Sequence, residues 1–155
     1  MLTVSDRVSR GEAEDKSGDL LADALRADGY DVERRVVADE AAEIAAAIED
    51  LAAAAAVVLT TGGTGLAPRD VTPEATRTVL QREAPGIAEA LRADSARKTP
   101  HGLLSRGTAG VVGRALVVNL PGSVGGCRDG YAVLQPALGH ALALLAGDQT
   151  EHVQT

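Results

Sequence analysis

The chain of 155 residues has almost no aromatic side chains, because it contains Tyr30 and Tyr131 but no Phe or Trp. Nucleic-acid-binding modules that stack bases on aromatic rings are therefore not expected. Positive charge is also scarce, since 15 Lys and Arg face 22 Asp and Glu, which gives a net charge of −7. This net charge repels a phosphate backbone, although local basic spots still allow small phosphorylated ligands to bind.

Cysteine and long apolar runs are scarce as well. Cys127 is the one cysteine, which excludes a disulfide within the chain and a multi-cysteine zinc site. No apolar run reaches the ~18 residues of a membrane span, and the first six residues lack the basic and apolar regions of a signal peptide. We expect neither a membrane nor a nucleic acid as partner and predict a cytoplasmic protein.

Apolar residues make up 45% of the chain, which is enough for one core built from Ala, Val, Leu and Ile. Ile44, Ile48 and Leu51 fall on one helical face of an Ala-rich stretch, and alanine strengthens that helix prediction. We predict a single domain over residues 1–148 and a flexible tail over residues 149–155.

Short apolar runs alternate with helical patterns along the chain. The pattern predicts strands at residues 2–4, 32–37, 56–60 and 115–119, and helices at 17–27, 41–56, 73–80, 86–96 and 127–145. Pro136 indicates a kink or a new start within the last helix. Such alternation is typical of a doubly wound α/β sheet, whose ligands bind at the carboxyl ends of the strands.

A glycine-rich segment directly follows the third predicted strand. Its glycines let backbone N–H groups turn toward an anion, its threonines add hydroxyl donors, and Arg69 offers a fork of donors for phosphate. Asp70 suits Mg²⁺, and Thr72 is expected to cap a helix that opens at Pro73. The cradle residues are Thr61, Gly62, Gly63, Thr64 and Gly65.

Other motifs do not fit this segment. It is not a Walker A loop, because no lysine follows Gly65, and it is not a dinucleotide-binding fingerprint, because no helix opens at once. The alternative is a tight turn that leads into a capped helix, with a solvated pair of Arg69 and Asp70.

Two further segments carry candidate ligand groups. Residues after the fourth strand lead into a helix whose N-terminus can bind an anion, although a plain turn is the alternative. Ser105 and Arg106 form a second pair of donors, whereas His101 has no partners for a metal site. The segment around Ser123 lacks the spacing of a hydrolase nucleophile elbow. The candidates after the fourth strand are Asn119, Pro121, Gly122 and Ser123.

Three acidic residues follow three predicted strands: Asp6, Asp39 and Asp70. If these strands are parallel, the carboxylates emerge at one edge of the sheet, beside the glycine-rich cradle. That arrangement favours a magnesium-assisted phosphoryl or nucleotidyl transfer. Each acid taken alone is also compatible with a helix N-cap.

Together these motifs resemble the MogA/MoaB family of molybdenum cofactor biosynthesis proteins, whose molybdopterin-binding domain also occurs in gephyrin. The resemblance covers nearly the whole chain. It implies a three-layer α/β/α sandwich with a mostly parallel sheet. The blocks that carry it are residues 3–7, 15–18, 61–74, 104–107 and 119–123.

The resemblance also implies a function. Active members of the family bind molybdopterin and transfer AMP from ATP to its terminal phosphate. Asp39 and Asp70 match the family's functional acids and would hold Mg²⁺, whereas Ser105 matches a serine of the pterin site. The glycine-threonine cradle, Arg69, Arg106 and the turn from Asn119 to Ser123 would line the ligand site.

Partners follow from the same resemblance. Members are typically homotrimers, sometimes hexamers, and their product serves a molybdenum insertase. The main alternative is a non-catalytic molybdopterin carrier or an inactive MoaB-type paralogue; a scaffold role like that of gephyrin suits a single domain poorly. The motifs do not separate MogA-like from MoaB-like members, or a molybdenum from a tungsten pathway.

Overall fold

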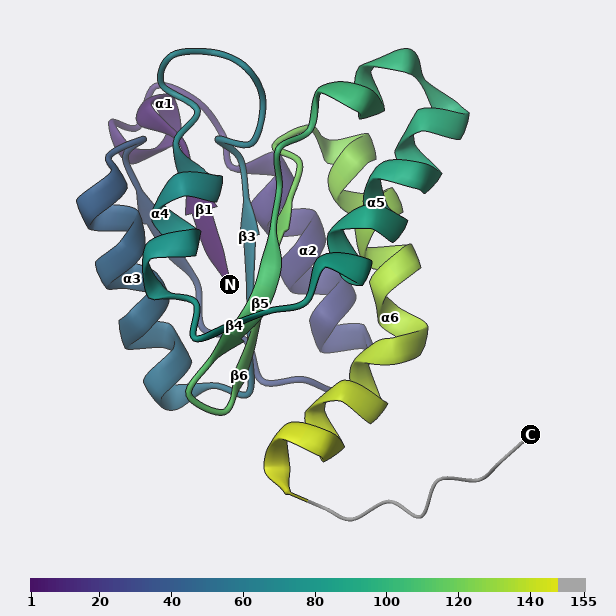
Figure 1. The fold of residues 1–155 in the computed structure, drawn as a ribbon. Helices are drawn as coiled ribbons and strands as arrows, with labels where there is room; N and C mark the ends of the chain where they lie inside the picture. The colour runs from purple at the N-terminus through teal and green to yellow at the C-terminus, as the bar shows by residue number, and fades with distance from the viewer. Residues whose placement is uncertain (148–155) are drawn as a thin grey trace.

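Six strands form one sheet in the order β2-β1-β3-β6-β5-β4 in the computed structural model, which describes residues 1–147 (Figure 1). β1, β2, β3 and β6 run parallel, and β4 and β5 add an antiparallel edge. The predicted tail at residues 149–155 lies outside the described residues. The strands are β1 (Leu2–Val4), β2 (Arg35–Val37), β3 (Val57–Thr61), β4 (Arg82–Glu83), β5 (Ala109–Val112) and β6 (Ala115–Leu120).

Helices cover both faces of the sheet, so the predicted three-layer α/β/α sandwich is confirmed. α3 and α4 lie on one face, and α2, α5 and α6 lie on the other (Figure 1). The helices are α1 (Asp6–Ser9), α2 (Lys16–Ala27), α3 (Ala41–Ala54), α4 (Thr72–Val79), α5 (Pro85–Lys98) and α6 (Val124–Ala146), with a 3₁₀ helix η1 (Pro100–Leu104).

The core divides into two apolar clusters, one on each face of the sheet. Ile44 and Ile48 of α3 pack against Val117 of β6, whereas Val118 of the same strand packs in the other cluster with Leu134 of α6. All residues of β6 are buried, which explains its continuous apolar run. Burial of each large aliphatic side chain contributes about 1.5–3 kcal/mol.

Two details of the predicted elements were wrong, and one of the two alternatives at Pro136 is excluded. β2 begins at Arg35 rather than at residue 32. Thr72 is the first residue of α4 and not its N-cap, because its hydroxyl donates to the carbonyl of Gly62 over 2.9 Å. α6 continues through Pro136, so no new helix starts there. Pro136 lies on an exposed part of the helix, where water can satisfy the carbonyl that loses its partner.

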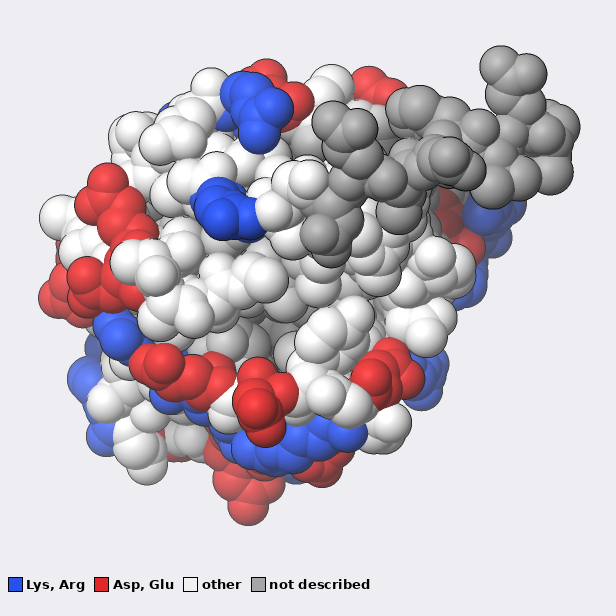
Figure 2. All heavy atoms as spheres, turned by 90° about the horizontal axis from the view of Figure 1, so that it is seen from below, with Lys and Arg blue, Asp and Glu red and all other residues white. Residues whose placement is uncertain are grey.

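The amino ends of the parallel strands form the face of the molecule shown in Figure 2. Charged side chains lie along the left, lower and right margins of this face, and its visible centre is mostly uncharged and hollowed. A cavity of about 240 Å³ lies here, lined in part by Met1, Tyr30 and Val57. None of the helices in the described part of the chain combines the length and the apolar character that crossing a bilayer requires. The candidate site residues lie at the opposite end of the sheet.

Candidate functional site

Two adjoining cavities lie at the carboxyl ends of the parallel strands. The larger has a volume of about 610 Å³ and the smaller about 370 Å³. Gly63, Asp70 and Gly122 line both of them. These residues come from the loops after β3 and β6, two adjacent parallel strands that end at the same edge. The cavities therefore meet at the glycine-rich segment that the sequence singled out.

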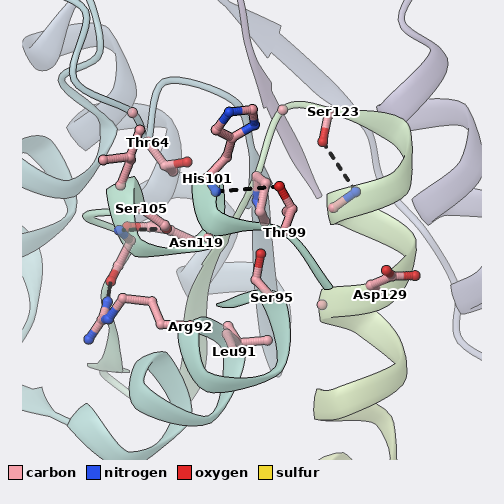
Figure 3. A pocket seen from close by; sticks show the side chains of 18 of the residues that line it. Thr64, Leu91, Arg92, Ser95, Thr99, His101, Ser105, Asn119, Ser123 and Asp129 are labelled. Carbon is pink, nitrogen blue, oxygen red and sulfur yellow. Dashed lines mark hydrogen bonds between the residues drawn. The ribbon is translucent and has the colours of Figure 1, made fainter. Parts of the chain in front are cut away.

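The larger cavity lies between α5, η1 and the first turns of α6 (Figure 3). Ser105 and Ser123 contribute hydroxyl groups from opposite sides of the cavity, and both also accept backbone hydrogen bonds. Ser123 is the N-cap of α6 and accepts from the amide of Gly126, so the positive end of this helix faces the cavity. An anionic ligand is favoured at this position.

The smaller cavity is enclosed by the loops that follow β1, β2 and β3. Arg7 and Lys16 bring positive charge to its lining, and four acids bring negative charge: Glu14, Asp15, Asp39 and Asp70. Asp15 is the N-cap of α2, accepting from the amide of Gly18 over 3.0 Å. Mixed charge of this kind suits a ligand that carries both phosphate groups and a metal ion.

Close approach of the backbone explains the glycines between the cavities. Gly62 and Gly63 have φ values of +100° and +63°, which residues other than glycine rarely adopt. A Cβ on Gly62 would lie 2.2 Å from the carbonyl oxygen of Val4, and a Cβ on Gly122 would lie 3.0 Å from the Cα of Gly62. The loops after β1, β3 and β6 are thus in contact.

The three acids that follow the strands do gather at one edge, as predicted. The amide of Asp6 donates to Oδ2 of Asp39 over 2.7 Å, and the amide of Asp39 donates to Oδ1 of Asp6 over 3.0 Å. The remaining oxygen of Asp39, Oδ1, faces Gly63, where a Cβ would lie only 3.1 Å away. One oxygen of Asp39 is thus held by the protein, and the other points to the junction of the cavities.

The pKa values of Asp6 and Asp39 are shifted in opposite directions. Burial raises the pKa of Asp39, and the neighbouring charges of Asp6 and Asp70 raise it further. Hydrogen bonds from Arg69 lower the pKa of Asp6, and the bond from the amide of Asp39 adds to that effect. A cation at the junction would be favoured next to Asp39, because it would relieve the repulsion between the carboxylates.

Asp39 and Asp70 suit Mg²⁺, which takes one or two protein carboxylates and fills its other positions with water and substrate phosphate oxygens. Asp70 accepts from the amide of Ala67 through Oδ2, which orients its carboxylate. Within residues 1–147 no group of three or more His, Cys, Asp or Glu is arranged to hold a metal ion. Two carboxylates of the chain would leave the other positions of such an ion to water and to ligand oxygens.

Several predicted ligand residues have their hydrogen bonds satisfied within the protein. Asn119 is buried, and its amide donates to the hydroxyls of Thr60 and Thr76 over 3.0 and 2.9 Å while accepting from the amide of Thr108. The hydroxyl of Thr61 donates to the carbonyl of Pro121 over 2.8 Å. These groups connect β3, β6 and α4 beneath the site, and Thr64 is buried with them.

The two predicted arginines also bind protein groups. Arg106 donates to the carbonyl of Gly65 over 2.7 Å, to the carbonyl of Asp70 and to the carboxylate of Glu74. It therefore holds both ends of the glycine-rich loop. Arg69 is ion-paired with Asp6 and Glu40.

Residues of α5, η1 and α6 were missed by the sequence reasoning. Arg92, Ser95 and Asp129 line the larger cavity from within α5 and α6, where a polar residue looks like an ordinary solvent-facing one, and Thr99 and His101 line it from the start of η1. Arg92 also donates to the carbonyl of Gly107 over 2.8 Å. In the smaller cavity, Asp15 and Lys16 belong to residues 15–18, one of the blocks that carry the family resemblance. That block was the signal in the sequence that could have identified them as site residues. The missed residues of the larger cavity include Arg92, Ser95, Thr99, His101 and Asp129 (Figure 3).

Comparison with known families decides what this site belongs to. A family model described as "Probable molybdopterin binding domain" matches residues 1–140. The chain belongs to the MogA/MoaB family. Among solved structures of this family, the molybdopterin biosynthesis enzyme MoaB from Thermus thermophilus superposes with a TM-score of 0.87 at 46% sequence identity, covering 95% of this chain and 94% of the other.

Curated relatives agree with this MogA/MoaB assignment. A molybdenum cofactor biosynthesis bifunctional protein of Synechococcus elongatus is 44% identical over 95% of this chain and 47% of its own length. A molybdopterin adenylyltransferase of Helicobacter pylori is 35% identical over 96% of this chain and 87% of its own length. The chain spans about half the length of the bifunctional relatives that it matches.

Proposed function

We propose that this chain is a molybdopterin adenylyltransferase, which binds molybdopterin and transfers AMP from ATP to its terminal phosphate. The observation that carries the proposal is the pair of cavities that meet at Gly63, Asp70 and Gly122. A transfer between two phosphorylated substrates requires two sites with one shared edge, where the reacting groups are held together. The relatives named as molybdopterin adenylyltransferases support the same reaction.

Ser105, which matches the serine of the family's pterin site, lines the larger cavity, and this supports binding of molybdopterin there. ATP then occupies the smaller cavity, where Arg7 and Lys16 can contact its phosphates. An oxygen of the pterin phosphate attacks the α-phosphorus of ATP, and a new P–O bond forms. The bond from that phosphorus to the oxygen bridging to the β-phosphate breaks, and pyrophosphate leaves with the electron pair.

The protein contributes positioning and charge to this reaction rather than a covalent nucleophile. The N-terminus of α6, which begins directly after Ser123 beside the larger cavity, favours negative charge there. Asp39 and Asp70 would hold Mg²⁺, which neutralises charge on the transferring phosphates when it is bound. Oδ1 of Asp39, which faces Gly63, and the oriented carboxylate of Asp70 fit that role.

The decisive experiment incubates the protein with ATP, MgCl₂ and molybdopterin and detects adenylylated pterin by mass spectrometry. We expect this product together with an equal amount of pyrophosphate. Binding of molybdopterin without any adenylylated product would instead identify a carrier or an inactive MoaB-type paralogue. Omission of ATP provides the control for carried-over product.

We further propose that the protein is a homotrimer that passes its product to a molybdenum insertase in the cytoplasm. Exposed leucines near the site, Leu66, Leu103 and Leu104, support self-association, because exposed apolar side chains favour protein contacts. The free thiol of Cys127 suits a reducing compartment.

A further inference from the structure

Asp6 and Asp39 are joined by two reciprocal hydrogen bonds at the ends of β1 and β2. Each residue's amide donates to the other's carboxylate, over 2.7 and 3.0 Å. Each carboxylate thus fixes the backbone that carries the other. This arrangement fixes the position of Asp39 and the direction of its bound oxygen, Oδ2, and leaves Oδ1 facing Gly63.

Arg69 adds a third loop to this pair. Its Nε donates to Oδ2 of Asp6 over 3.1 Å and its Nη2 to Oδ1 of Asp6 over 2.9 Å, which is a bidentate contact. Its Nη1 donates to Glu40 over 2.8 Å. Arg69 immediately precedes Asp70, so the guanidinium ties the loop of Asp70 to the loops of Asp6 and Asp39.

The expectation that Arg69 binds substrate phosphate fits this geometry poorly. Each of the three guanidinium nitrogens already donates to a carboxylate oxygen, and all three bonds stay within 3.1 Å. Arg69 also lines neither of the two cavities of the site, whereas the next residue, Asp70, lines both. The side chain is therefore directed toward the acids rather than toward the ligand space.

We propose that Asp6 and Arg69 are positioning residues, a charged clasp that sets the spacing and orientation of Asp39 and Asp70 for the metal ion. The inference rests on the proposed adenylyl transfer, because that reaction gives the two acids their metal. Asp6 and Arg69 act through Asp39 and Asp70 and touch no substrate themselves. Outer groups of this kind typically change metal affinity or activity about 10–100-fold when they are removed.

The chemistry of the clasp explains why an Asp and an Arg are needed together. Without a positive partner, the carboxylate of Asp6 would repel those of Asp39 and Asp70. Arg69 compensates that charge and, through its planar fork, fixes the plane of the Asp6 carboxylate. A lysine keeps the charge but has no fork, so Arg69→Lys separates the effect of charge from that of geometry.

The test measures binding of Mn²⁺ by electron paramagnetic resonance, in the presence of an ATP analogue with a methylene group between the α- and β-phosphates. The variants are Asp6→Asn, Arg69→Gln, Arg69→Lys and the double variant Asp6→Asn/Arg69→Gln. Arg35→Gln is the matched control, because Arg35 also bridges two carboxylates, those of Glu33 and Asp50, away from the site. Melting curves check that each variant is folded.

We expect each single variant to weaken Mn²⁺ binding about tenfold and the double variant to be no worse than the singles, because the two residues act as one unit. Metal-free affinity for the analogue should stay unchanged, and Arg35→Gln should behave like wild type. In steady-state adenylylation, the loss should appear in kcat and in the Mg²⁺ requirement, with the KM for ATP unchanged.

Other outcomes would overturn the clasp. Weaker metal-free binding of the analogue by Arg69→Gln, with wild-type behaviour of Asp6→Asn, would make Arg69 a phosphate ligand. Losses that multiply in the double variant, or Mn²⁺ binding at the wild-type level in both single variants, would also refute it. If wild type forms adenylylated pterin in any of these cases, the proposed function survives without the clasp; if it forms none, the proposed function fails by itself.

Discussion

Polar residues around the two cavities fall into two groups according to how much of their bonding capacity the protein already uses. The amide oxygen and nitrogen of Asn119 and the guanidinium of Arg106 form hydrogen bonds within the protein. These two residues therefore support the site rather than bind the ligand. Asp39 keeps one oxygen directed at the junction. Substitutions in the first group should mainly change stability, whereas substitutions in the second should mainly change chemistry.

Asp70→Ala should reduce adenylyl transfer by about 10²–10³-fold, because it removes one of the two carboxylates available to the metal ion. The melting temperature should change little, since Asp70 makes a single hydrogen bond to the amide of Ala67 on an exposed loop. Asp23→Ala, which removes an exposed acid of α2 paired with Arg26, is the control. Turnover of Asp70→Ala at the wild-type rate would show that Asp70 only stabilises the turn and does not take part in catalysis.

Gly63→Ala should lower the free energy of unfolding by about 1–3 kcal/mol, because it places a side chain at positive φ. The new Cβ would also lie 2.3 Å from the buried hydroxyl of Thr72, which adds to this loss, and 3.1 Å from Oδ1 of Asp39, so that a displaced Asp39 should abolish ATP binding. Chemical denaturation and calorimetry with ATP measure the two effects. The control is Gly86→Ala in α5, which has open space around it and should be neutral or stabilising. Undiminished ATP affinity in Gly63→Ala would contradict the assignment of ATP to the cavity that Gly63 lines.

Asn119→Ala should destabilise the fold by about 2–4 kcal/mol, because the buried amide of Thr108 and the buried hydroxyl of Thr60 lose the partner that Asn119 provides, and Thr76 keeps only its bond to the carbonyl of Thr72. Urea denaturation measures the loss. Gln81→Ala removes an amide of the same kind from an exposed loop, where it binds the amide of Gly113, and should cost far less. Equal stability of the two variants would show that the network beneath the site is not needed for folding.

Between elements, the loop after β3 is held by contacts that reach far along the chain. Arg106 binds Gly65 and Asp70 from a position 41 and 36 residues away, and Thr72 closes the loop onto Gly62. The loop is thus clamped from two sides. The loop therefore needs no further ordering when a ligand binds, which lowers the entropic cost of binding.

Arg106→Lys should loosen this loop while keeping the charge, because an ammonium group cannot satisfy three separated acceptors in one plane. Hydrogen exchange of the amides at residues 62–70 should accelerate about tenfold or more. Arg26→Lys, on the exposed side of α2, should leave exchange in this loop unchanged. Unaltered exchange in Arg106→Lys would mean that Thr72 and the glycine geometry hold the loop by themselves.

The sequence predicts the elements of this molecule better than the contacts between them. Apolar periodicity and the glycines after β3 and β6 locate the strands and their loops, because both signals are local. The partners of Arg69 and Asn119 depend on how distant segments align: Asn119 meets Thr60 because β6 pairs with β3 in parallel register. No local pattern contains that register, so both residues look like ligand groups in the sequence.

At the scale of the whole molecule, we expect light scattering to give a mass near three times the 15.8 kDa of the chain. Burial of Leu66, Leu103 and Leu104 between copies would remove apolar surface from water and stabilise the assembly. Leu103→Lys should weaken the trimer, since a charge would be buried at the contact. Leu144→Lys, at an exposed leucine of α6, is the control. A mass near 15.8 kDa at all concentrations would refute self-association.

The pairing of β3 with β6 has a consequence for synthesis on the ribosome. More than fifty residues separate these two strands in the chain, although they lie side by side in the sheet. At translation rates of about 5–20 residues per second, β3 waits several seconds with one edge unpaired. During that interval α2 and α3, which precede β3 in the chain, can cover its two faces, but its free edge can associate with another nascent chain, and that association competes with folding. Slow translation or a chaperone that shields residues 57–61 should raise the yield of folded protein.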